Sequence, residues 1–297
     1  MKVAYLIDKE SLGGGCEYIA RKSAARQAAG DVCRIFYSDR GECTAAKIDA
    51  WGADEIVVNH LKALVQLLGN PFRRPKGRVM FVVHGIHLRK YVWRRNEGGG
   101  LMETALPYWL RRGLEAWLYH RCDRIVALTE SDRADILRWY GHSLKVEVEP
   151  NSLKGWVPRL AEGLPLGATG SFDYVCIGRF DYQKGQDRWI EKIKNEELRM
   201  KNNGWRTLFI GDGSTLVECK SLAKKLGVAD RCVFAGAIPE AERYLKCAPV
   251  VVSPSRWEGM PYLMMKARAL GCRILATDCP GNRDVLAGYE KWEVLDL

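Results

Sequence analysis

A short loop in the second half of the chain carries two cations between glycines. It reads CIGRFDYQKG at 176–185 and follows a run of strand-forming residues. Arg179 offers a planar fork of donors and Lys184 a point charge, and the two together can neutralise a diphosphate. Gly178 and Gly185 flank the pair and let the backbone approach a ligand closely. We therefore interpret the loop as an anion site, with two ordinary exposed cations as the simpler alternative.

A second loop, SPSRWEGMP at 253–261, joins a buried apolar run to a helix. Pro261 suits the first helical position, because its missing N–H costs no hydrogen bond there. The amides around Gly259 and Met260 would then point out of the helix end, where they can hold a phosphate. Glu258 can accept hydrogen bonds from sugar hydroxyls. The alternative for Glu258 is an acid that the helix dipole stabilises.

Two glycine-containing turns follow other strand-like runs. SLGGGCE at 11–17 opens the first helix, so that Gly14 and Gly15 would bring the helix end close to a diphosphate. A plain strand–helix turn explains this segment equally well, because it does not read GxGxxG. Gly211 and Asp212 end a strand of the second half and would border the same crevice as the two loops above.

HGIH at 84–87 places two histidines three residues apart after a predicted strand. No third metal ligand is evident, and the chain contains no DxD, so we expect no metal site. A loop histidine poised over an acceptor is one interpretation of His84, and an ordinary polar residue is the other. Asp8 and Glu10, after the first strand, are weaker candidates for a base.

Short apolar runs alternate with helical patterns along the whole chain, which predicts an α/β fold with parallel sheets. The two halves repeat this alternation of strands and helices, so that two Rossmann-like domains would face a central cleft. The expected domains are 1–155 and 170–297, joined by a linker rich in glycine and proline. The predicted strands cover 2–7, 33–37, 55–59, 78–83, 124–128, 145–148, 174–177, 207–210, 232–234, 250–252 and 273–276, and the predicted helices 16–29, 106–121, 187–198, 216–226 and 261–270.

The formal charge of +10 comes mostly from the first half of the 297 residues. There is no acid between Glu55 and Glu97, and the bases of this stretch are Arg73, Arg74, Lys76, Arg78, Arg89, Lys90, Arg94 and Arg95. Such a patch would attract membrane phosphates, a phosphorylated acceptor or nucleic acid, or it is simply a solvated face. No nucleic-acid motif is present, so we expect no nucleic-acid partner.

Peripheral contact with an anionic membrane has a second motivation in the aromatic helix at 107–119, which contains Tyr108, Trp109 and Trp117. Packing of this helix into the core is the favoured alternative. No apolar run approaches the roughly 20 residues that span a bilayer. The N-terminus does not resemble a signal peptide, and none of the ten cysteines forms a CxxC pair. We therefore expect a cytoplasmic protein with reduced thiols, at most peripheral at the membrane.

Taken in order, these motifs resemble the retaining family 4 glycosyltransferases of GT-B architecture (glycosyl transferases group 1). The resemblance covers most of the chain and rests on the shared order and spacing of loosely matching segments. The segments are GGGCE at 13–17, HGIH at 84–87, CDRIVALTESDRADILRWYG at 122–141, VEPNSLK at 148–154, CIGRFDYQKG at 176–185, FIGDGS at 209–214 and PSRWEGMPYLMMKARALG at 254–271.

The resemblance assigns roles to the residues that match. The N-terminal domain would take the acceptor, with His84 near the anomeric carbon, and the C-terminal domain the nucleotide sugar. Arg179 and Lys184 would bind the diphosphate and stabilise the leaving group, and Glu258 would contact the donor sugar. The implied catalytic residues are His84, Glu258, Arg179 and Lys184, and the implied donor-binding residues are Gly14, Gly15, Gly178, Arg179, Lys184, Gly211, Asp212, Glu258, Gly259, Met260, Pro261 and Lys266.

Two departures from the family pattern stand out. The family carries a second glutamate eight positions after the first, which grips the ribose, and this chain has Lys266 there. A lysine cannot accept a hydrogen bond from a hydroxyl, so Lys266 would add a cation or mark altered donor choice or lost activity. The sequence also ends at Leu297, before the crossover helix that closes the family fold.

The implied reaction moves a sugar from a nucleoside diphosphate to a hydroxyl of a glycan, a lipid-linked acceptor or a cell-surface polysaccharide precursor. The resemblance implies a hexosyl group, retention of configuration, and no metal or other cofactor, the nucleotide sugar being a substrate. Two alternatives stay open: a catalytically impaired nucleotide-sugar-binding protein, and an enzyme of the sugar-nucleotide epimerase type.

Overall fold

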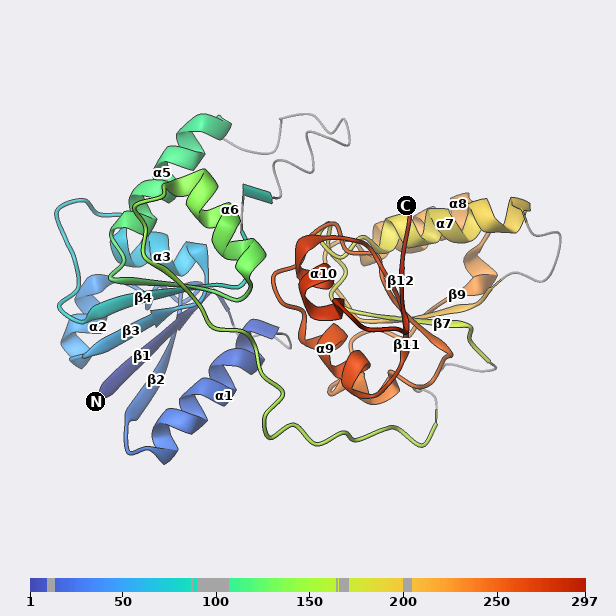
Figure 1. Ribbon diagram of the computed structural model, residues 1–297, viewed down its shortest axis with the longest axis horizontal. Helices are drawn as coiled ribbons and strands as arrows, with labels where there is room; N and C mark the ends of the chain where they lie inside the picture. Colours follow the sequence, from blue (N-terminus) through green and yellow to red (C-terminus); the bar gives the residue numbers. More distant parts are fainter. Residues whose placement is uncertain (10–13, 87, 90–106, 164, 166–170, 200–204) are drawn as a thin grey trace. The chain divides into compact units, whose positions relative to one another are not determined.

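The protein was analysed as a computed structural model, and its chain divides into two compact units, Met1–Asn151 and Ser152–Leu297 (Figure 1). The structure describes residues 1–9, 14–86, 88–89, 107–163, 165, 171–199 and 205–297. Ser11, Leu12 and Gly13 of the first glycine turn, together with Glu10 and His87, lie outside the described residues. Within the described residues, no helix is long and apolar enough to cross a bilayer.

The first unit is a six-stranded parallel sheet of order β2-β1-β3-β4-β5-β6. Strands and helices alternate along the chain, as parallel connections require. The strands are β1 (Lys2–Ile7), β2 (Val32–Tyr37), β3 (Glu55–Val58), β4 (Arg78–Val83), β5 (Arg124–Ala127) and β6 (Val146–Val148), and the helices are α1 (Gly14–Ala28), α2 (Ala45–Trp51), α3 (Leu61–Leu68), α5 (Tyr108–His120) and α6 (Glu130–Tyr140).

Helices cover both faces of this sheet. Because neighbouring residues of a strand face opposite sides, Ala4 and Leu6 of β1 join a buried cluster with α2, α3, α5 and α6. Val3 and Tyr5 are buried on the other face, where Figure 1 shows α1. This coverage on both sides explains why the strands read as continuous apolar runs rather than alternating ones.

The second unit repeats the architecture with a six-stranded parallel sheet of order β12-β11-β10-β7-β8-β9. Its strands are β7 (Tyr174–Ile177), β8 (Thr207–Ile210), β9 (Cys232–Phe234), β10 (Val250–Ser253), β11 (Arg273–Ala276) and β12 (Trp292–Val294). Its helices are α7 (Gln186–Arg199), α8 (Leu216–Lys225), α9 (Tyr262–Ala269) and α10 (Pro280–Leu286), with short 3₁₀ turns η1 (Ala229–Arg231) and η2 (Ala241–Tyr244).

The chain reverses its winding between β7 and β10, which are neighbours in the second sheet. The connection after β7 leads to α7, which packs with α8 on one face through Trp189 and Ile190. The connection after β10 leads to α9, which packs with α10 on the opposite face through Met264 and Ala267. Two loops that diverge in this way leave a crevice at the carboxyl ends of their strands, the usual place for a ligand in such sheets.

The expected α/β fold with parallel sheets is confirmed, and three details differ. The pattern did not predict the helices α2, α3, α6 and α10, two of which have only seven residues. It also did not predict the strand β12. The first strand of the second unit and its partners lie where they were expected. Pro261 was expected at the first helical position but is the N-cap of α9, with φ −72° and ψ 114°, so the helix begins one residue later.

Candidate functional site

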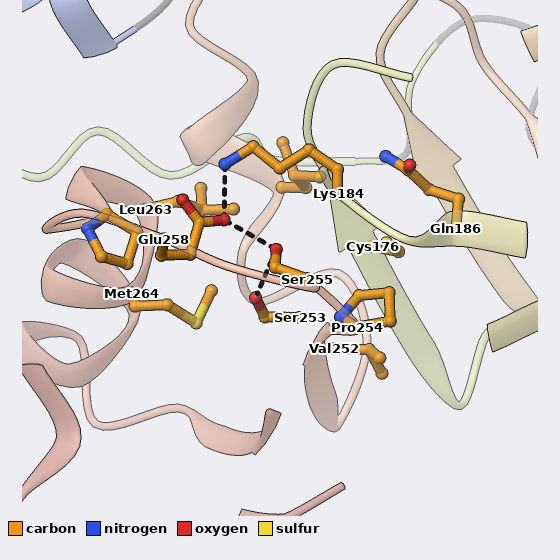
Figure 2. A pocket seen from close by; sticks show the side chains of 12 residues that line it. Cys176, Lys184, Gln186, Val252, Ser253, Pro254, Ser255, Glu258, Leu263 and Met264 are labelled. Atoms are coloured by element: carbon orange, nitrogen blue, oxygen red, sulfur yellow. Dashed lines mark hydrogen bonds and ion pairs between the residues drawn. The ribbon is translucent and has the colours of Figure 1, made fainter. Parts of the chain in front are cut away.

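A small pocket opens at the reversal point of the second sheet, at the carboxyl ends of β7 and β10 (Figure 2). Its volume of about 20 Å³ has room for roughly one water molecule. A sugar nucleotide would therefore lie across the surrounding loops rather than inside the pocket. The lining residues are Cys176, Ile177, Lys184, Gln186, Val252, Ser253, Pro254, Ser255, Glu258, Pro261, Leu263 and Met264.

An ion pair between the two loops forms the polar wall of this pocket. Lys184 Nζ lies 2.7 Å from Glu258 Oε1, and Ser255 Oγ donates to the same oxygen at 2.6 Å. Glu258 is buried, whereas the Lys184 side chain is about a quarter exposed. A buried carboxylate needs such partners, since an uncompensated charge would cost several kcal/mol. The structure thus brings together two residues that the sequence singled out on separate loops.

A second ion pair, which the sequence did not indicate, ties the same two loops together. Arg256 donates to both carboxylate oxygens of Asp187, at 2.9 and 2.7 Å, and to the Tyr182 carbonyl at 2.9 Å. Its guanidinium also lies 4.1 Å from the centroid of the Tyr182 ring. Asp187 stands in the first turn of α7, so Arg256 fixes the β10–α9 loop to the start of that helix. In the sequence, the only sign of this contact was an arginine beside Trp257, whose planar guanidinium can bind a carboxylate through two hydrogen bonds.

Gly185 and Gly211 owe their residue type to close backbone contacts at the crevice. A Cβ on Gly185, at φ +67°, would lie 2.3 Å from the Pro254 carbonyl oxygen. A Cβ on Gly211, at φ +148°, would lie 1.9 Å from that of Gly178. Asp212 accepts a hydrogen bond from the amide of Gly213 at 2.7 Å, and its carbonyl accepts one from Phe180 at 2.9 Å. The glycines therefore let three loops pack edge to edge.

Arg179 pairs with a carboxylate of its own loop. Its side chain is 62% exposed, and Nε donates to Asp181 Oδ2 at 2.5 Å. Asp181 Oδ1 also accepts from the amide of Lys184 at 3.0 Å, so this one carboxylate shapes the loop that carries both cations. Arg179 does not line the pocket. It stands on the solvent side of the loop, where an anion could replace or share its contact with Asp181.

Gly259 and Met260 lead into α9 next to the start of α10. A Cβ on Gly281, in the first turn of α10, would lie 2.1 Å from the Gly259 carbonyl oxygen and 2.8 Å from Cβ of Glu258. The amides of Met264 and Met265 both donate to the carbonyl of Pro261, at 3.1 and 3.2 Å. The segment that carries Glu258 is therefore held between the two helices.

Lys266 does not line the pocket, although the resemblance counts its position among the donor-binding ones. The side chain is 5% exposed, and its Nζ lies 2.9 Å from Glu242 Oε1. The same ammonium is 5.8 Å from the centroid of the Trp156 ring. Glu242 belongs to η2, so a carboxylate from elsewhere in the chain neutralises the lysine that stands at the family's glutamate position.

In the first unit, His84 lies at the carboxyl end of β4. Its Nε2 is 3.0 Å from Asn59 Oδ1, and the Tyr18 ring stands edge-on at 4.8 Å. Burial, with a smaller contribution from the nearby His60, lowers the pKa of His84 to about 4. Asn59 uses its Nδ2 to donate to the Val57 carbonyl at 3.1 Å, which leaves Oδ1 to accept from His84. The neutral ring therefore carries its proton on Nε2 and presents Nδ1 as an acceptor.

Other residues of the first unit that the sequence singled out are placed as follows. Gly14 begins α1 and Gly15 follows it. Asp8 pairs with Lys62 at 2.8 Å and accepts from Ser38 at 2.7 Å. Partial burial disfavours the charged form of Asp8, but the hydrogen bonds from Lys62 and Ser38 and the nearby positive charges together outweigh it and lower its pKa. A paired, acidic carboxylate of this kind is a poor general base.

The prediction that Arg89 belongs to an exposed basic patch is wrong. This side chain is buried, and it donates to Asp132 at 2.5 Å and to Asp135 at 2.9 Å. Arg74 pairs with Asp123 at 2.5 Å. Lys90, Arg94 and Arg95 lie outside the described residues. A run of bases along the sequence says nothing about which of them fold inward to meet an acid.

Among the residues that the structure describes, no group of three His, Cys, Asp or Glu side chains could hold a metal ion. The second-unit site itself offers Lys184, Arg179, Glu258 and hydroxyl donors. These groups suit an anion that carries a hydroxylated ring, because cations and amides bind phosphate while a carboxylate accepts from hydroxyls.

Residues 171–294, which include the pocket and both of its loops, match the model of the family described as glycosyl transferases group 1. The match covers less than half of the chain. Every site residue assigned above to the second unit lies within the matched residues. Those of the first unit lie outside the match.

Relatives with known names match part of the chain. The chain is 27% identical over 173 residues to the amylovoran biosynthesis glycosyltransferase AmsD of Erwinia amylovora, covering 57% of this chain and 47% of that one. It is 29% identical over 118 residues to the lipopolysaccharide core biosynthesis mannosyltransferase LpsB of Rhizobium meliloti, covering 38% and 33%. The chain thus matches only about half or less of the length of these relatives.

Solved structures resemble the whole chain in fold. The sucrose-phosphate synthase of Thermosynechococcus elongatus superposes with a TM-score of 0.77 at 17% identity, covering 99% of this chain and 85% of that one. WaaG, described as a glycosyltransferase involved in lipopolysaccharide biosynthesis, gives 0.71 at 16% identity, covering 98% and 85%. The two parallel six-stranded sheets with their helices are those of GT-B glycosyltransferases, as expected from the sequence.

Proposed function

We propose that the chain transfers a glycosyl group from a nucleoside diphosphate sugar to an acceptor hydroxyl. The observation that carries this proposal is the Lys184–Glu258 pair at the reversal point of a glycosyl transferases group 1 domain. It sets a cation and a carboxylate side by side at the place where open parallel sheets bind their ligands. The cation suits the diphosphate, and the carboxylate suits the sugar hydroxyls.

The catalytic contribution of the cations follows from the charge that develops during transfer. The sugar passes through an oxocarbenium-like state while negative charge grows on the departing diphosphate. Lys184 has three donors, of which Glu258 takes one, and the others can meet phosphate oxygens. Arg179 and the start of α9 would add to this stabilisation. Groups that oppose a growing charge bind the transition state more strongly than the ground state.

His84 would serve the acceptor side of the reaction. As a neutral ring with Nδ1 as an acceptor, it can receive a hydrogen bond from a hydroxyl without placing a positive charge beside the oxocarbenium-like sugar. Gly14 and Gly15, at the start of α1, would lie beside the diphosphate. In this proposal the first unit takes the acceptor and the second unit the donor.

The substrates belong to the proposal as well. UDP is present in the structures described as TarM, GtfA and HepE complexes, and the named relatives are described as glycosyltransferases of amylovoran or lipopolysaccharide core biosynthesis. We therefore propose a nucleoside diphosphate hexose as donor and a glycan or lipid-linked precursor of a surface polysaccharide as acceptor, with retention of configuration and without a metal. Ten cysteines without a disulfide support a cytoplasmic location. An acceptor on lipid would also bring the first unit to an anionic membrane.

A donor panel tests the proposal directly. UDP-, GDP- and ADP-hexoses are added to the protein, and apparent melting temperature and nucleotide release are measured with and without EDTA. One donor should raise the melting temperature, because a ligand that binds the folded state stabilises it. Release of its nucleoside diphosphate should require an acceptor extract and should survive EDTA. Failure of every donor to bind would contradict the proposal.

A binding protein without transferase activity is the second candidate, and the Lys266–Glu242 pair favours it. The family's ribose-binding carboxylate is replaced here by a buried lysine that is already neutralised. Donor binding with neither transfer nor hydrolysis would favour this candidate. Conversion of the donor sugar in the absence of any acceptor would instead indicate an epimerase-type enzyme.

A further inference from the structure

Helix α5 exposes an apolar face to solvent in addition to the face that it buries. Glu115, Leu118 and Tyr119 are buried in the first unit. On the other side, Trp109 is 71% exposed, and Leu110 and Leu114 are each 42% exposed. Packing into the core was the favoured interpretation of this aromatic helix, and it is wrong for Trp109. An ordinary surface helix has one apolar stripe, whereas α5 has two.

The exposed residues form one continuous stripe along the helix. Side chains four positions apart lie above one another, which aligns Trp109 with Gly113 and Trp117, and Leu110 with Leu114. Arg121 extends the stripe beyond the helix end, since it donates to the carbonyls of Asn70, Pro71 and Arg73 at 3.0–3.3 Å. Phe72, within that turn, is 97% exposed. We call the exposed Trp109, Leu110, Leu114 and Phe72, together with the half-buried Trp117, which also packs against the core, the α5 stripe.

Arginines border the α5 stripe on both sides. Arg121 stacks over Trp117, with its guanidinium 4.7 Å from the ring centroid. On the other side α5 and α6 lie next to each other, with an open groove of about 440 Å³ between them. The groove is lined by Tyr108, Trp109, Arg112, Gly113, Ala116, Leu137, Arg138, Trp139, Tyr140, Gly141 and His142, none of them acidic. Arg138 is 69% exposed, lies 5.4 Å from the Trp139 ring and forms a long ion pair with Asp135 at 3.7 Å.

We propose that the α5 stripe and its arginine border dock the first unit onto an anionic phospholipid bilayer. An exposed stripe of aromatic and aliphatic side chains flanked by cations is how a helix lies in the plane of a membrane interface. The only acid on α5 is Glu115, which is buried and accepts hydrogen bonds from Tyr140 and Arg111. The exposed side of the helix therefore carries no acid that would repel a negative headgroup. Charge complementarity favours an anionic bilayer over a neutral one.

Two arginines of the basic patch at 73–95 are engaged by acids, whereas Arg73, Lys76 and Arg78 of that patch are exposed. Arg89 of that patch is buried and Arg74 is paired with Asp123. The proposal specifies the membrane contact of the proposed function, but binding to vesicles can succeed or fail independently of sugar transfer.

Vesicle flotation with paired variants tests the proposal. The full chain is mixed with vesicles of phosphatidylcholine alone or with phosphatidylglycerol, and the bound fraction is measured. The test variant is Trp109→Ser with Phe72→Ser. The control is Val157→Ser with Val217→Ser, which removes two side chains of similar exposure, 70% and 74%, from the second unit. Binding to anionic vesicles should fall by about tenfold or more in the test variant and stay unchanged in the control.

The charge border is tested separately with Arg138→Glu, which should weaken binding to anionic vesicles and reduce its dependence on salt. Equal binding to neutral and anionic vesicles, or an equal loss in the test and control variants, would overturn the proposal. So would a wild-type dimer that the Trp109 and Phe72 changes convert to a monomer without altering vesicle binding, since the stripe would then join two copies. Donor-induced stabilisation of the variants should match that of the wild type, which separates this failure from failure of the proposed function.

Discussion

Lys184 and Glu258 are 74 positions apart in the sequence, and their charged atoms meet at 2.7 Å where β7 and β10 end. The contact exists because these strands are neighbours in the sheet while their helices cover opposite faces. Each residue depends on the other. Glu258 is buried and needs a counter-charge, and the ion pair with Glu258 holds the Lys184 ammonium over the crevice.

Removal of Lys184 should lower turnover strongly. In Lys184→Ala, we expect kcat to fall by about 10²-fold or more, by analogy with the loss of one preorganised donor. The melting temperature should also fall, because Glu258 is left buried without its cation. Lys184→Arg should recover part of both. Initial rates of nucleotide release measure the first effect, and turnover within twofold of the wild type would remove Lys184 from the mechanism.

Arg179 should act on turnover without stabilising the fold. Arg179→Ala is expected to lower kcat by about 10²-fold while the melting temperature stays constant, because the side chain is exposed and makes only a surface ion pair. Arg273→Ala is a matched control. Arg273, the first residue of β11, is 61% exposed and pairs with Glu293. If the two variants have the same rate, Arg179 is an ordinary surface cation.

Ser255 should position Glu258 rather than touch the donor. Its hydroxyl is buried and donates to Glu258 Oε1 at 2.6 Å, while Thr277 donates to its carbonyl at 2.5 Å. We expect Ser255→Ala to lower kcat by about tenfold, the scale of one hydrogen bond to a charged group, with a smaller change in KM. Ser255→Thr should restore the rate. Ser221→Ala removes an exposed helical hydroxyl and should have no effect. A lower melting temperature with unchanged kcat would assign Ser255 to the fold alone.

The low pKa of His84 predicts a dependence of stability on pH. The folded state holds this pKa at about 4, below the value of about 6.5 for an unfolded histidine. Between these values the unfolded state binds a proton that the folded state refuses, so stability is retained above about pH 6.5 and lost as the pH falls toward 4. As the pH is lowered from 7 to 4, the melting temperature should fall less steeply in His84→Asn than in the wild type. The exposed His120 provides the control substitution.

Exchanging the charges of the Lys266–Glu242 pair should reveal its contribution to the free energy of unfolding. Lys266→Glu restores the family residue but sets two carboxylates against each other, and we expect it to lose about 2 kcal/mol or more of unfolding free energy. Combining it with Glu242→Lys should recover much of that loss. A double-mutant cycle in urea measures the coupling. Equal stability of all four proteins would show that the pair contributes nothing.

The sequence predicted the strands well because their apolar runs are continuous, and the sheets bury them on both faces. It predicted less well where tertiary contacts decide the outcome. Arg256 could not be paired with Asp187, nor Ser255 with Glu258, because such contacts require knowing which strands are neighbours. Arg89 looked like one base among many, and only the fold turns it inward toward Asp132. Short helices such as α10 carry too few residues to establish a period.

Close backbone packing at the crevice limits how its chemistry can be altered. Residues 185, 211 and 281 have no room for even a methyl group, because a Cβ at each would lie within 2.3 Å of a neighbouring carbonyl oxygen. Variation at these points would shift whole loops instead of reshaping contacts with a sugar. Changes to ligand contacts at the crevice therefore have to begin with side chains of its loops rather than with these backbone positions.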